Sequence, residues 1–294
     1  MHATLIGYSA IALWSLLALF TRWAGPVPPF KLLAMTFALA FCVMLVKWAL
    51  CRQSPLRFAR VPVKSWLLGT GGLFGYHACY FYALQHAPAI EASLLCYLWP
   101  LLIVLFSGLL PGHKLQLPHL LAALMGLAGT LLIVIKPGHH WGGGEISGYL
   151  AALIAAFLWA GYSVTSRLQQ QVATDSVGWF CLATAVLGLI AHQLFEAPMA
   201  ALSDRNWLAI LALGLGPVGI AFFTWDYGMK HGNVSLLGLL AYSAPLLSTL
   251  LLVVFAVAEG SPRLWLACLL IVTSALLPWL WSRLRAGKLI AQAQ

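Results

Sequence analysis

Charged side chains are scarce in this sequence of 294 residues: only 8% of them are Asp, Glu, Lys or Arg, and only 7 are acidic. Soluble domains carry charge on about a quarter of their residues, and disordered chains combine high charge with low hydrophobicity. The scarcity of charge therefore excludes both classes. Hydrophobic residues make up 62% of the chain, and a chain of this composition needs lipid as its solvent.

Motifs that mark enzymes and cofactor sites are also missing. The sequence contains no H-E-x-x-H, no G-x-S-x-G and no P-loop, which are typical of zinc hydrolases, serine hydrolases and nucleotide-binding proteins. None of its 6 cysteines forms a C-x-x-C pair, so neither a zinc site nor a redox motif is indicated. We therefore expect no enzymatic activity, no cofactor and no metal.

Apolar residues gather in ten stretches, each long enough to cross a bilayer, which takes about 20 residues of helix. Pro, Gly or charged residues separate the stretches. We predict transmembrane helices at 4–22, 30–50, 65–84, 88–110, 117–135, 147–168, 175–195, 207–229, 233–257 and 263–282. The predicted fold class is an all-α integral membrane protein of ten transmembrane helices, with the lipid bilayer as its surroundings.

An internal repeat relates the two halves of the chain at a constant offset of 145 residues. Tyr97 returns as Tyr242, and Pro100 returns as Pro245. Each of the two prolines is followed by two leucines. Self-similarity at a fixed period is a signal of repeated architecture. Each half holds five spans, and five is odd, so the second half enters the membrane from the opposite side. The sequence therefore predicts two inverted five-helix repeats, a plan found in secondary transporters with a midplane substrate site.

The excess of basic residues is explained by membrane insertion rather than by nucleic-acid binding. The 16 Lys and Arg exceed the 7 Asp and Glu, for a formal net charge of +9. Most of these basic residues fall in the loops on the side of the N-terminus, and cytoplasmic loops are the ones enriched in Lys and Arg. We therefore place both termini in the cytoplasm, with repeats at 1–140 and 145–285 and a cytoplasmic tail at 286–294. No nucleic-acid or obligate protein partner is expected.

These features resemble the EamA branch of the drug/metabolite transporter superfamily. The resemblance rests on the two five-helix halves, on the glycine-rich third span with Gly69, Gly71 and Gly72, and on the spans that contain Pro100 and Pro245. It implies a secondary transporter of the bacterial inner membrane that exports small molecules. Because no nucleotide-binding motif is present, a gradient must drive the transport.

Three tryptophans lie near the middle of predicted spans, although Trp usually sits at the two membrane–water interfaces. They are Trp14, Trp99 and Trp159. An indole N–H at that depth needs a partner or a wet cavity, so we predict an aromatic wall around the substrate. A packed core is the alternative. Because Trp14 and Trp159 occupy equivalent repeat positions, we expect them on opposite walls of the central interface.

An ionisable side chain and a phenol share one face of the third span. His77 lies near its middle, and Tyr80 follows three residues later. Ionisable groups inside a membrane are costly, and a functional role is their default hypothesis. We predict that His77 and Tyr80 meet a substrate carboxylate. The alternative for His77 is a hydrogen bond to a backbone carbonyl of a neighbouring helix.

Pro100 and Pro245 each lie inside a predicted span. A proline removes the hydrogen bond to the carbonyl four residues earlier, which belongs to Cys96 in the first half and to Ala241 in the second. We predict that these carbonyls accept hydrogen bonds from a substrate ammonium group and that the bends act as hinges. A static kink relieved by packing is the alternative.

Two acidic residues each admit two interpretations. Asp226 precedes Lys230 by four residues, so an i,i+4 ion pair at the membrane surface stands against a role as a cytoplasmic gate. Glu91 follows Pro88 in the first turn of a predicted helix, where the helix dipole favours a carboxylate. Its alternative role is proton coupling or binding of an ammonium group.

The function predicted from these residues is export of aromatic amino acids, such as tryptophan, phenylalanine and tyrosine, and of similar small amphipathic metabolites. Transport would proceed by alternating access through a midplane cavity between the repeats. The alternative is a broad exporter of drugs and quaternary cations, which aromatic cages bind through cation–π contacts. That alternative needs a carboxylate that is reachable from the cavity.

Overall fold

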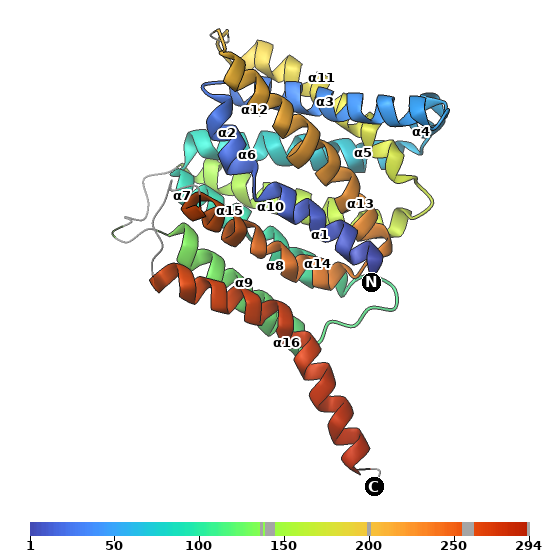
Figure 1. The fold of residues 1–294 in the computed structure, drawn as a ribbon, viewed down its shortest axis with the longest axis vertical. Helices are drawn as coiled ribbons and strands as arrows, with labels where there is room; N and C mark the ends of the chain where they lie inside the picture. Colours follow the sequence, from blue (N-terminus) through green and yellow to red (C-terminus); the bar gives the residue numbers. More distant parts are fainter. Residues whose placement is uncertain (136–137, 139–144, 199–200, 255–261, 293–294) are drawn as a thin grey trace.

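The structure is a computed structural model that describes residues 1–135, 138, 145–198, 201–254 and 262–292. All regular elements in these residues are helical (Figure 1). In chain order they are α1 (His2–Trp14), α2 (Leu17–Ala24), α3 (Pro29–Leu50), α4 (Pro55–Ala59), α5 (Val63–Thr70), η1 (Gly71–Gly75), α6 (Tyr76–His86), α7 (Ala89–Cys96), α8 (Trp99–Ser107), α9 (Leu117–Val134), α10 (Ile146–Ser166), η2 (Arg167–Gln169), η3 (Thr174–Ser176), α11 (Val177–Phe195), α12 (Asp204–Leu215), η4 (Gly216–Ile220), α13 (Ala221–His231), α14 (Val234–Ala241), α15 (Ser243–Val254) and α16 (Pro262–Gln292).

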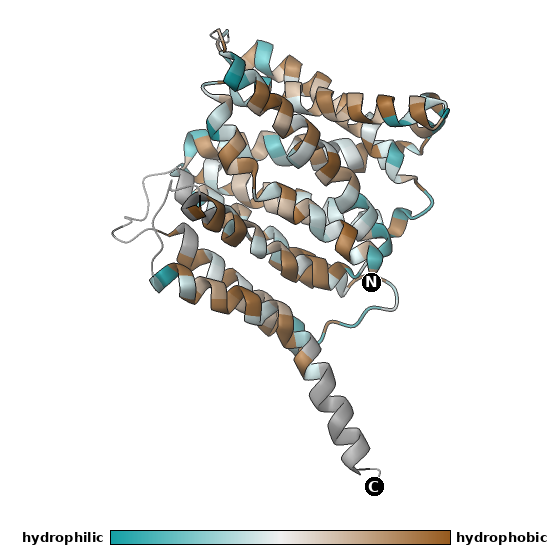
Figure 2. Ribbon diagram, viewed as in Figure 1, coloured by the Kyte–Doolittle hydropathy of each residue, from teal (hydrophilic) through white to brown (hydrophobic). Residues whose placement is uncertain are grey.

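Five segments of the described chain are long and apolar enough to cross a membrane. They are His2–Ala24, Pro29–Leu50, Ile146–Gln169, Thr174–Phe195 and Asp204–His231. Shorter apolar helices accompany them at Glu91–Ser107, Leu117–Leu132, Val234–Ser248 and Pro262–Pro278. Figure 2 shows apolar residues along most of the helices and strongly hydrophilic ones mainly near helix ends. The protein is thus a helical, multi-pass membrane protein.

Each predicted span coincides with helical residues, but several helices are interrupted. The breaks after α7 and α14 follow the rule for proline, because α7 ends at Cys96 and α14 ends at Ala241. These residues are the ones whose carbonyls lose their partners to Pro100 and Pro245. The helices are thus interrupted at both prolines, whereas the action of these points as hinges stays a prediction.

Two π-helical turns interrupt the third and eighth predicted spans. η1 separates α5 from α6, and η4 separates α12 from α13. Both ends of η1 precede the ends of η4 by 145 residues, and the same offset relates α6 to α13 and α7 to α14. A π-turn leaves a carbonyl without its usual partner four residues later. The repeat is therefore visible in the backbone as well as in the residues.

Helices from the two halves of the chain pack against one another. α3 lies along α11 at one edge of the bundle, and α9 lies along α16 at the other (Figure 1). Between them, α1 packs on α13 and α6 packs on α10. Gly7 and Gly228 bring α1 and α13 into backbone contact, because a Cβ on Gly228 would lie 2.4 Å from the Gly7 Cα. Small residues allow such close helix approach.

Polar contacts tie α3 to α11 at both ends. At one end the Glu196 carboxylate accepts hydrogen bonds from the backbone N–H groups of Phe30 (2.7 Å) and Lys31 (3.1 Å). These groups belong to the first turn of α3, which has no intrahelical partners for them. At the other end Lys47 pairs with Asp175 at 2.5 Å. These contacts hold α3 and α11 together at both ends.

α16 is longer than the predicted last span. It runs from Pro262 to Gln292, whereas the span was predicted to end at 282. The predicted tail at 286–294 is thus helical as far as Gln292, and its last two residues lie outside the described part. In Figure 1 the end of α16 projects from the bundle on the same side as the N-terminus.

Candidate functional site

A cavity of about 700 Å³ lies between helices from both halves of the chain. Its volume is in the range of small-molecule sites, roughly 300–1,000 Å³. Most of its walls are apolar or aromatic, and they come from α1, α2, α3, α6, α8, α10, α13 and α15, among others. All five residues predicted to bind substrate line it: Trp14, His77, Tyr80, Trp99 and Trp159. The structure therefore brings together residues from both repeats.

The three midspan tryptophans touch one another. The ring centroid of Trp14 lies 6.3 Å from that of Trp99 and 5.6 Å from that of Trp159, both in edge contact. The expectation that Trp14 and Trp159 stand on opposite walls is therefore wrong. Trp99 and Trp159 are only 7% and 4% exposed, so they form a packed floor, while Trp14 stays half-buried.

A fourth tryptophan, which the sequence analysis missed, packs against all three but does not line the cavity. Trp225 is fully buried and stacks on Trp159, with ring centroids 6.3 Å apart and planes at 19°. Its indole N–H donates to the Ser163 hydroxyl over 3.0 Å. Trp225 occupies the repeat position of Tyr80, 145 residues later, and extending the repeat to that pair would have found it.

His77 bonds a backbone carbonyl of its own span. Its Nδ1 lies 2.7 Å from the Leu73 oxygen, and a carbonyl can only accept, so Nδ1 carries the hydrogen. Leu73 belongs to the π-turn η1. The expected carbonyl of a neighbouring helix is not the partner, because the π-turn supplies one locally. Nε2 is the ring nitrogen left for a ligand.

Phenolic side chains line the wall beside His77. The Tyr80 hydroxyl shares a hydrogen bond of 3.1 Å with the Ser93 hydroxyl. Tyr76 stacks on Tyr80, with ring centroids 6.1 Å apart and planes at 14°, and Tyr97 also lines the cavity. Tyr76 and Tyr97 were missed by the sequence analysis. Tyr76 lies one helical turn before Tyr80, and that spacing could have indicated it.

The remaining predicted site residues lie off the cavity. Pro100 is buried in α8, and neither it nor Pro245 is among the cavity-lining residues. Glu91 lies in the first turn of α7, as the helix-start interpretation predicts, but it is buried at 5% exposure instead of facing the interface. The Tyr149 hydroxyl donates to its carboxylate. Glu91 is not part of the cavity wall.

The cavity reaches the molecular surface at one end of the bundle. There α2 and α6 end and α3 begins, and Arg22, Pro29 and Leu84 line the cavity. Arg22 and Leu84 are exposed. We call this region the mouth. Arg22 is the one charged side chain among the described lining residues apart from the titratable His77, and none of these residues is acidic.

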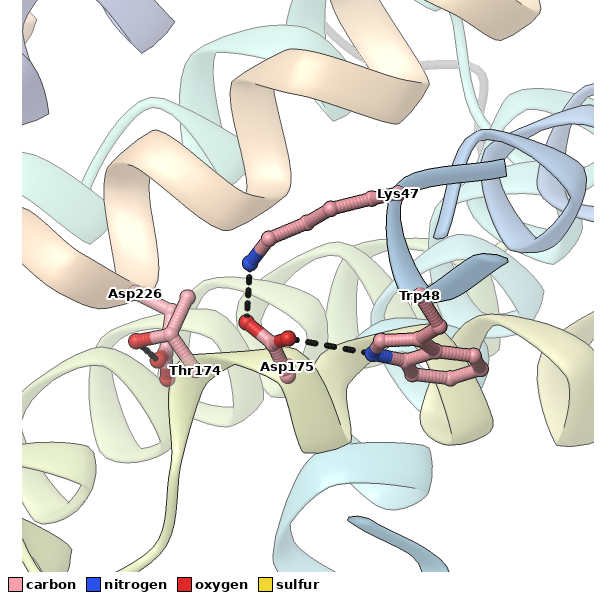
Figure 3. Close-up of polar contacts among 5 residues, drawn as sticks. All are labelled: Lys47, Trp48, Thr174, Asp175 and Asp226. Atoms are coloured by element: carbon pink, nitrogen blue, oxygen red, sulfur yellow. Dashed lines mark hydrogen bonds and ion pairs between the residues drawn. The ribbon is translucent and has the colours of Figure 1, made fainter. Parts of the chain in front are cut away.

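The opposite end, where α3, α10 and α13 finish, is closed by buried polar contacts. We call it the closed end. Asp226 and Lys230 form an ion pair of 2.8 Å with side chains only 3% and 4% exposed. The Thr174 hydroxyl donates to Asp226 over 2.7 Å, beside the Asp175 carboxylate that binds Lys47 and Trp48 (Figure 3). The predicted ion pair is present, but it is buried instead of lying at the surface.

Apolar helices of membrane-spanning length that surround an internal cavity are typical of a membrane transporter, and comparisons with known proteins identify the family. The sequence model of the EamA-like transporter family matches residues 2–135 and 146–279. The chain belongs to this family. It is therefore a transporter and not an enzyme.

Several relatives carry names that specify an activity. An aromatic amino acid exporter YddG of Ancylobacter novellus is 52% identical over 283 residues, covering 96% of this chain and 98% of the relative. The protein of that name from Escherichia coli is 31% identical over 301 residues, with coverage of 96% and 98%. The pseudopaline exporter CntI of Pseudomonas aeruginosa is 30% identical over 195 residues and covers 65% of this chain and 66% of the relative.

A solved structure is also similar. A crystal structure with 50% sequence identity superposes with a TM-score of 0.91 and covers 96% of this chain and 99% of that chain. At this identity and coverage the two chains share the fold over almost their full length.

Proposed function

We propose that this protein exports aromatic amino acids and similar small amphipathic metabolites across the bacterial inner membrane. Export proceeds by alternating access through the cavity, between two inverted five-helix repeats at 1–140 and 145–285, with both termini in the cytoplasm. The observation that carries the proposal is the lining of the cavity: it is aromatic, it holds Arg22 and His77, and none of its described residues is acidic.

The lining offers a partner to each part of an aromatic amino acid. The rings of Trp14 and Tyr76 present faces and edges to an aromatic side chain. Arg22 and the Tyr80 hydroxyl are donors for the carboxylate. Nε2 of neutral His77 is an acceptor, since Nδ1 already donates to Leu73, so we assign it to the ammonium group rather than to the carboxylate.

The names of the relatives support the substrate and the direction. Two relatives that match almost the full chain are named aromatic amino acid exporters. CntI, which matches about two-thirds of the chain, is named for a different metabolite. Family membership therefore leaves the substrate open, and the aromatic lining is the argument that selects aromatic amino acids.

A broad exporter of quaternary cations is the less favoured function. Aromatic rings alone attract cations, but a permanent cation inside a low-dielectric cavity also needs a neutralising carboxylate. Glu91, the candidate for that role, is hydrogen-bonded to Tyr149 away from the cavity. Arg22 at the mouth repels cations instead.

A difference between the two halves supports alternating access. Ser248 on α15 faces the cavity, whereas its repeat mate Ile103 is fully buried on α8, which packs along α10. α10 is continuous, while the equivalent α1 and α2 are separate helices. Inverted repeats in unequal conformations make one side open, and exchanging the two conformations opens the other.

Counterflow in liposomes tests the substrate. Vesicles that hold purified protein are loaded with unlabelled phenylalanine, and uptake of labelled phenylalanine is followed without an ion gradient. We expect accumulation well above that in protein-free vesicles, inhibited by tryptophan and tyrosine. Uptake that tetraethylammonium inhibits and tryptophan does not would favour the cation exporter instead.

Cysteine labelling tests the orientation. Arg57 on α4 and Lys64 at the start of α5 are exposed and fall in the connection between the second and third predicted spans, which we assign to the cytoplasm. Cysteines placed at these positions should react with an impermeant maleimide in inside-out vesicles and stay unlabelled in right-side-out vesicles. The reverse pattern would overturn the assigned topology.

A further inference from the structure

The repeat pairs Arg22 with Arg167 at the offset of 145 residues, and the structure holds the two arginines in different states. We propose that they are alternating gate residues. Arg167 closes its end of the cavity here by capping the last turn of α13, and Arg22 closes the mouth in the opposite state by capping the last turn of α6. This inference rests on the alternating access proposed above.

Arg167 caps the end of α13. Its guanidinium donates to the carbonyl of Lys230 and, over 3.3 Å, to that of Gly232. The last carbonyls of a helix have no intrahelical partner, and a cation beside them is favoured by both hydrogen bonding and the helix dipole. Because Arg167 directly follows α10, its two bonds tie the end of α10 to the end of α13.

Buried polar contacts complete the closure around Arg167. The Lys230 ammonium donates to the Val172 carbonyl over 2.9 Å and pairs with Asp226, which also accepts from Thr174. These groups come from α13 and from the segment before α11. Because Asp226, Lys230 and Val172 are buried, opening this end requires several bonds to break together.

Arg22 lies at the equivalent place of the mouth and makes no such bond. Its side chain is exposed, lines the cavity, and has no hydrogen-bond or ion-pair partner among the residues that the structure describes. The carbonyls equivalent to those of Lys230 and Gly232 belong to Gln85 and Ala87, where α6 ends at His86. The Gln85 carbonyl falls in the last turn of α6, which leaves it without an intrahelical partner.

Two further residues of the closed end have their repeat equivalents among the residues that line the cavity. Thr174 corresponds to Pro29, and Asp226 corresponds to Phe81, and both mates line the cavity. One set of repeat positions is therefore packed shut while the other surrounds open space. If the halves exchange conformations, Arg22 acquires the environment that Arg167 has here.

The two arginines should shift the balance of states in opposite directions. Removing Arg22 weakens closure of the mouth, and removing Arg167 weakens closure of the other end. A charge-assisted hydrogen bond is strong enough to change a two-state ratio by roughly tenfold. The reporter is Ala244→Cys, which lines the cavity on α15, in a chain whose native cysteines are replaced by serine or alanine.

The experiment measures labelling of this cysteine by an impermeant maleimide in right-side-out vesicles. We expect Arg167→Gln to slow labelling several-fold, because the mouth is then closed more often. Adding Arg22→Gln to Arg167→Gln should restore fast labelling. Arg205→Gln is the matched control: this arginine lies near the mouth over the Trp23 ring, 5.5 Å from its centroid, and does not line the cavity, so its removal should change nothing.

Labelling at the parent rate in Arg167→Gln, or no recovery in the double variant, would overturn the proposal. Where Arg167→Gln fails to fold, Thr174→Val weakens the same closure by one hydrogen bond and takes its place, with the same expectations. The labelling needs no substrate, so it is independent of the counterflow assay. Opposite shifts without phenylalanine counterflow would keep the gate and remove the substrate assignment.

Discussion

The indole N–H of Trp14 donates to the carbonyl of Pro217 over 3.0 Å, joining a cavity side chain of the first half to a π-turn of the second. His77 makes a second bond of this kind, to Leu73 in the other π-turn, although the two bonds are not at equivalent repeat positions. In each π-turn a backbone carbonyl accepts a hydrogen bond from a cavity-lining side chain, and such bonds help to satisfy irregular backbone inside a membrane. The walls of the cavity are thus anchored to irregular backbone.

Two substitutions at Trp14 should separate its roles. Trp14→Phe keeps a ring but leaves the Pro217 carbonyl without its donor, which costs about 1–3 kcal/mol of stability. We expect a lower melting temperature with a nearly unchanged KM for phenylalanine counterflow. Trp14→Ala also removes the ring and should raise KM at least several-fold. Equal KM values in the two variants would show that the ring does not contact substrate.

Asn and Gln test which nitrogen of His77 matters, because Asn places its amide near Nδ1 and Gln places it near Nε2. Nδ1 holds the Leu73 carbonyl, and Nε2 is the nitrogen assigned to the substrate. We expect His77→Gln to retain a KM close to that of the parent, and His77→Asn to raise it roughly tenfold, the effect of about 1.4 kcal/mol of lost binding. A larger effect in the Gln variant would make His77 a support of the π-turn only.

Removing one member of the Asp226–Lys230 ion pair at the closed end should strongly destabilise the folded protein. Asp226→Asn leaves the Lys230 ammonium without its counter-charge at 3% exposure, and such a change costs about 3–5 kcal/mol. Combining it with Lys230→Met removes the stranded charge and should recover much of the loss. Thermal unfolding of the three proteins in detergent measures this. A double variant less stable than Asp226→Asn would contradict the expectation.

Glu196 should matter for stability and not for substrate. Its carboxylate accepts hydrogen bonds from two N–H groups at the start of α3 and from His192 at 2.9 Å, and Glu196 itself does not line the cavity. Glu196→Gln should cost about 1.5–3 kcal/mol, the worth of a hydrogen bond to a charged group, and leave KM unchanged.

Glu145→Gln is the matched control for Glu196. Glu145 is an exposed carboxylate at the start of α10, and its substitution should leave the melting temperature almost unchanged. A raised KM in Glu196→Gln would instead show that the contacts between α3 and α11 influence substrate binding in the cavity.

The sequence alone determined the membrane class, the all-helical fold and the repeat of residues at an offset of 145. Apolar runs of span length have one solution in lipid, because every backbone group must be satisfied within the segment. Midspan Trp14, Trp99 and Trp159 could be predicted as site residues because a buried indole N–H has the same requirement. Both arguments are local, so the residues themselves are sufficient for them.

Tertiary structure decided what depends on how distant helices rotate and pack. It placed Trp159 against Trp14 and not across from it, turned Glu91 toward Tyr149, and gave Nδ1 of His77 to a π-turn that no residue pattern announced. The open end is the clearest case. Arg22 and Arg167 are the same residue type at equivalent positions, yet one is bonded and the other faces the cavity, because packing between the halves, and not residue identity, sets which end closes.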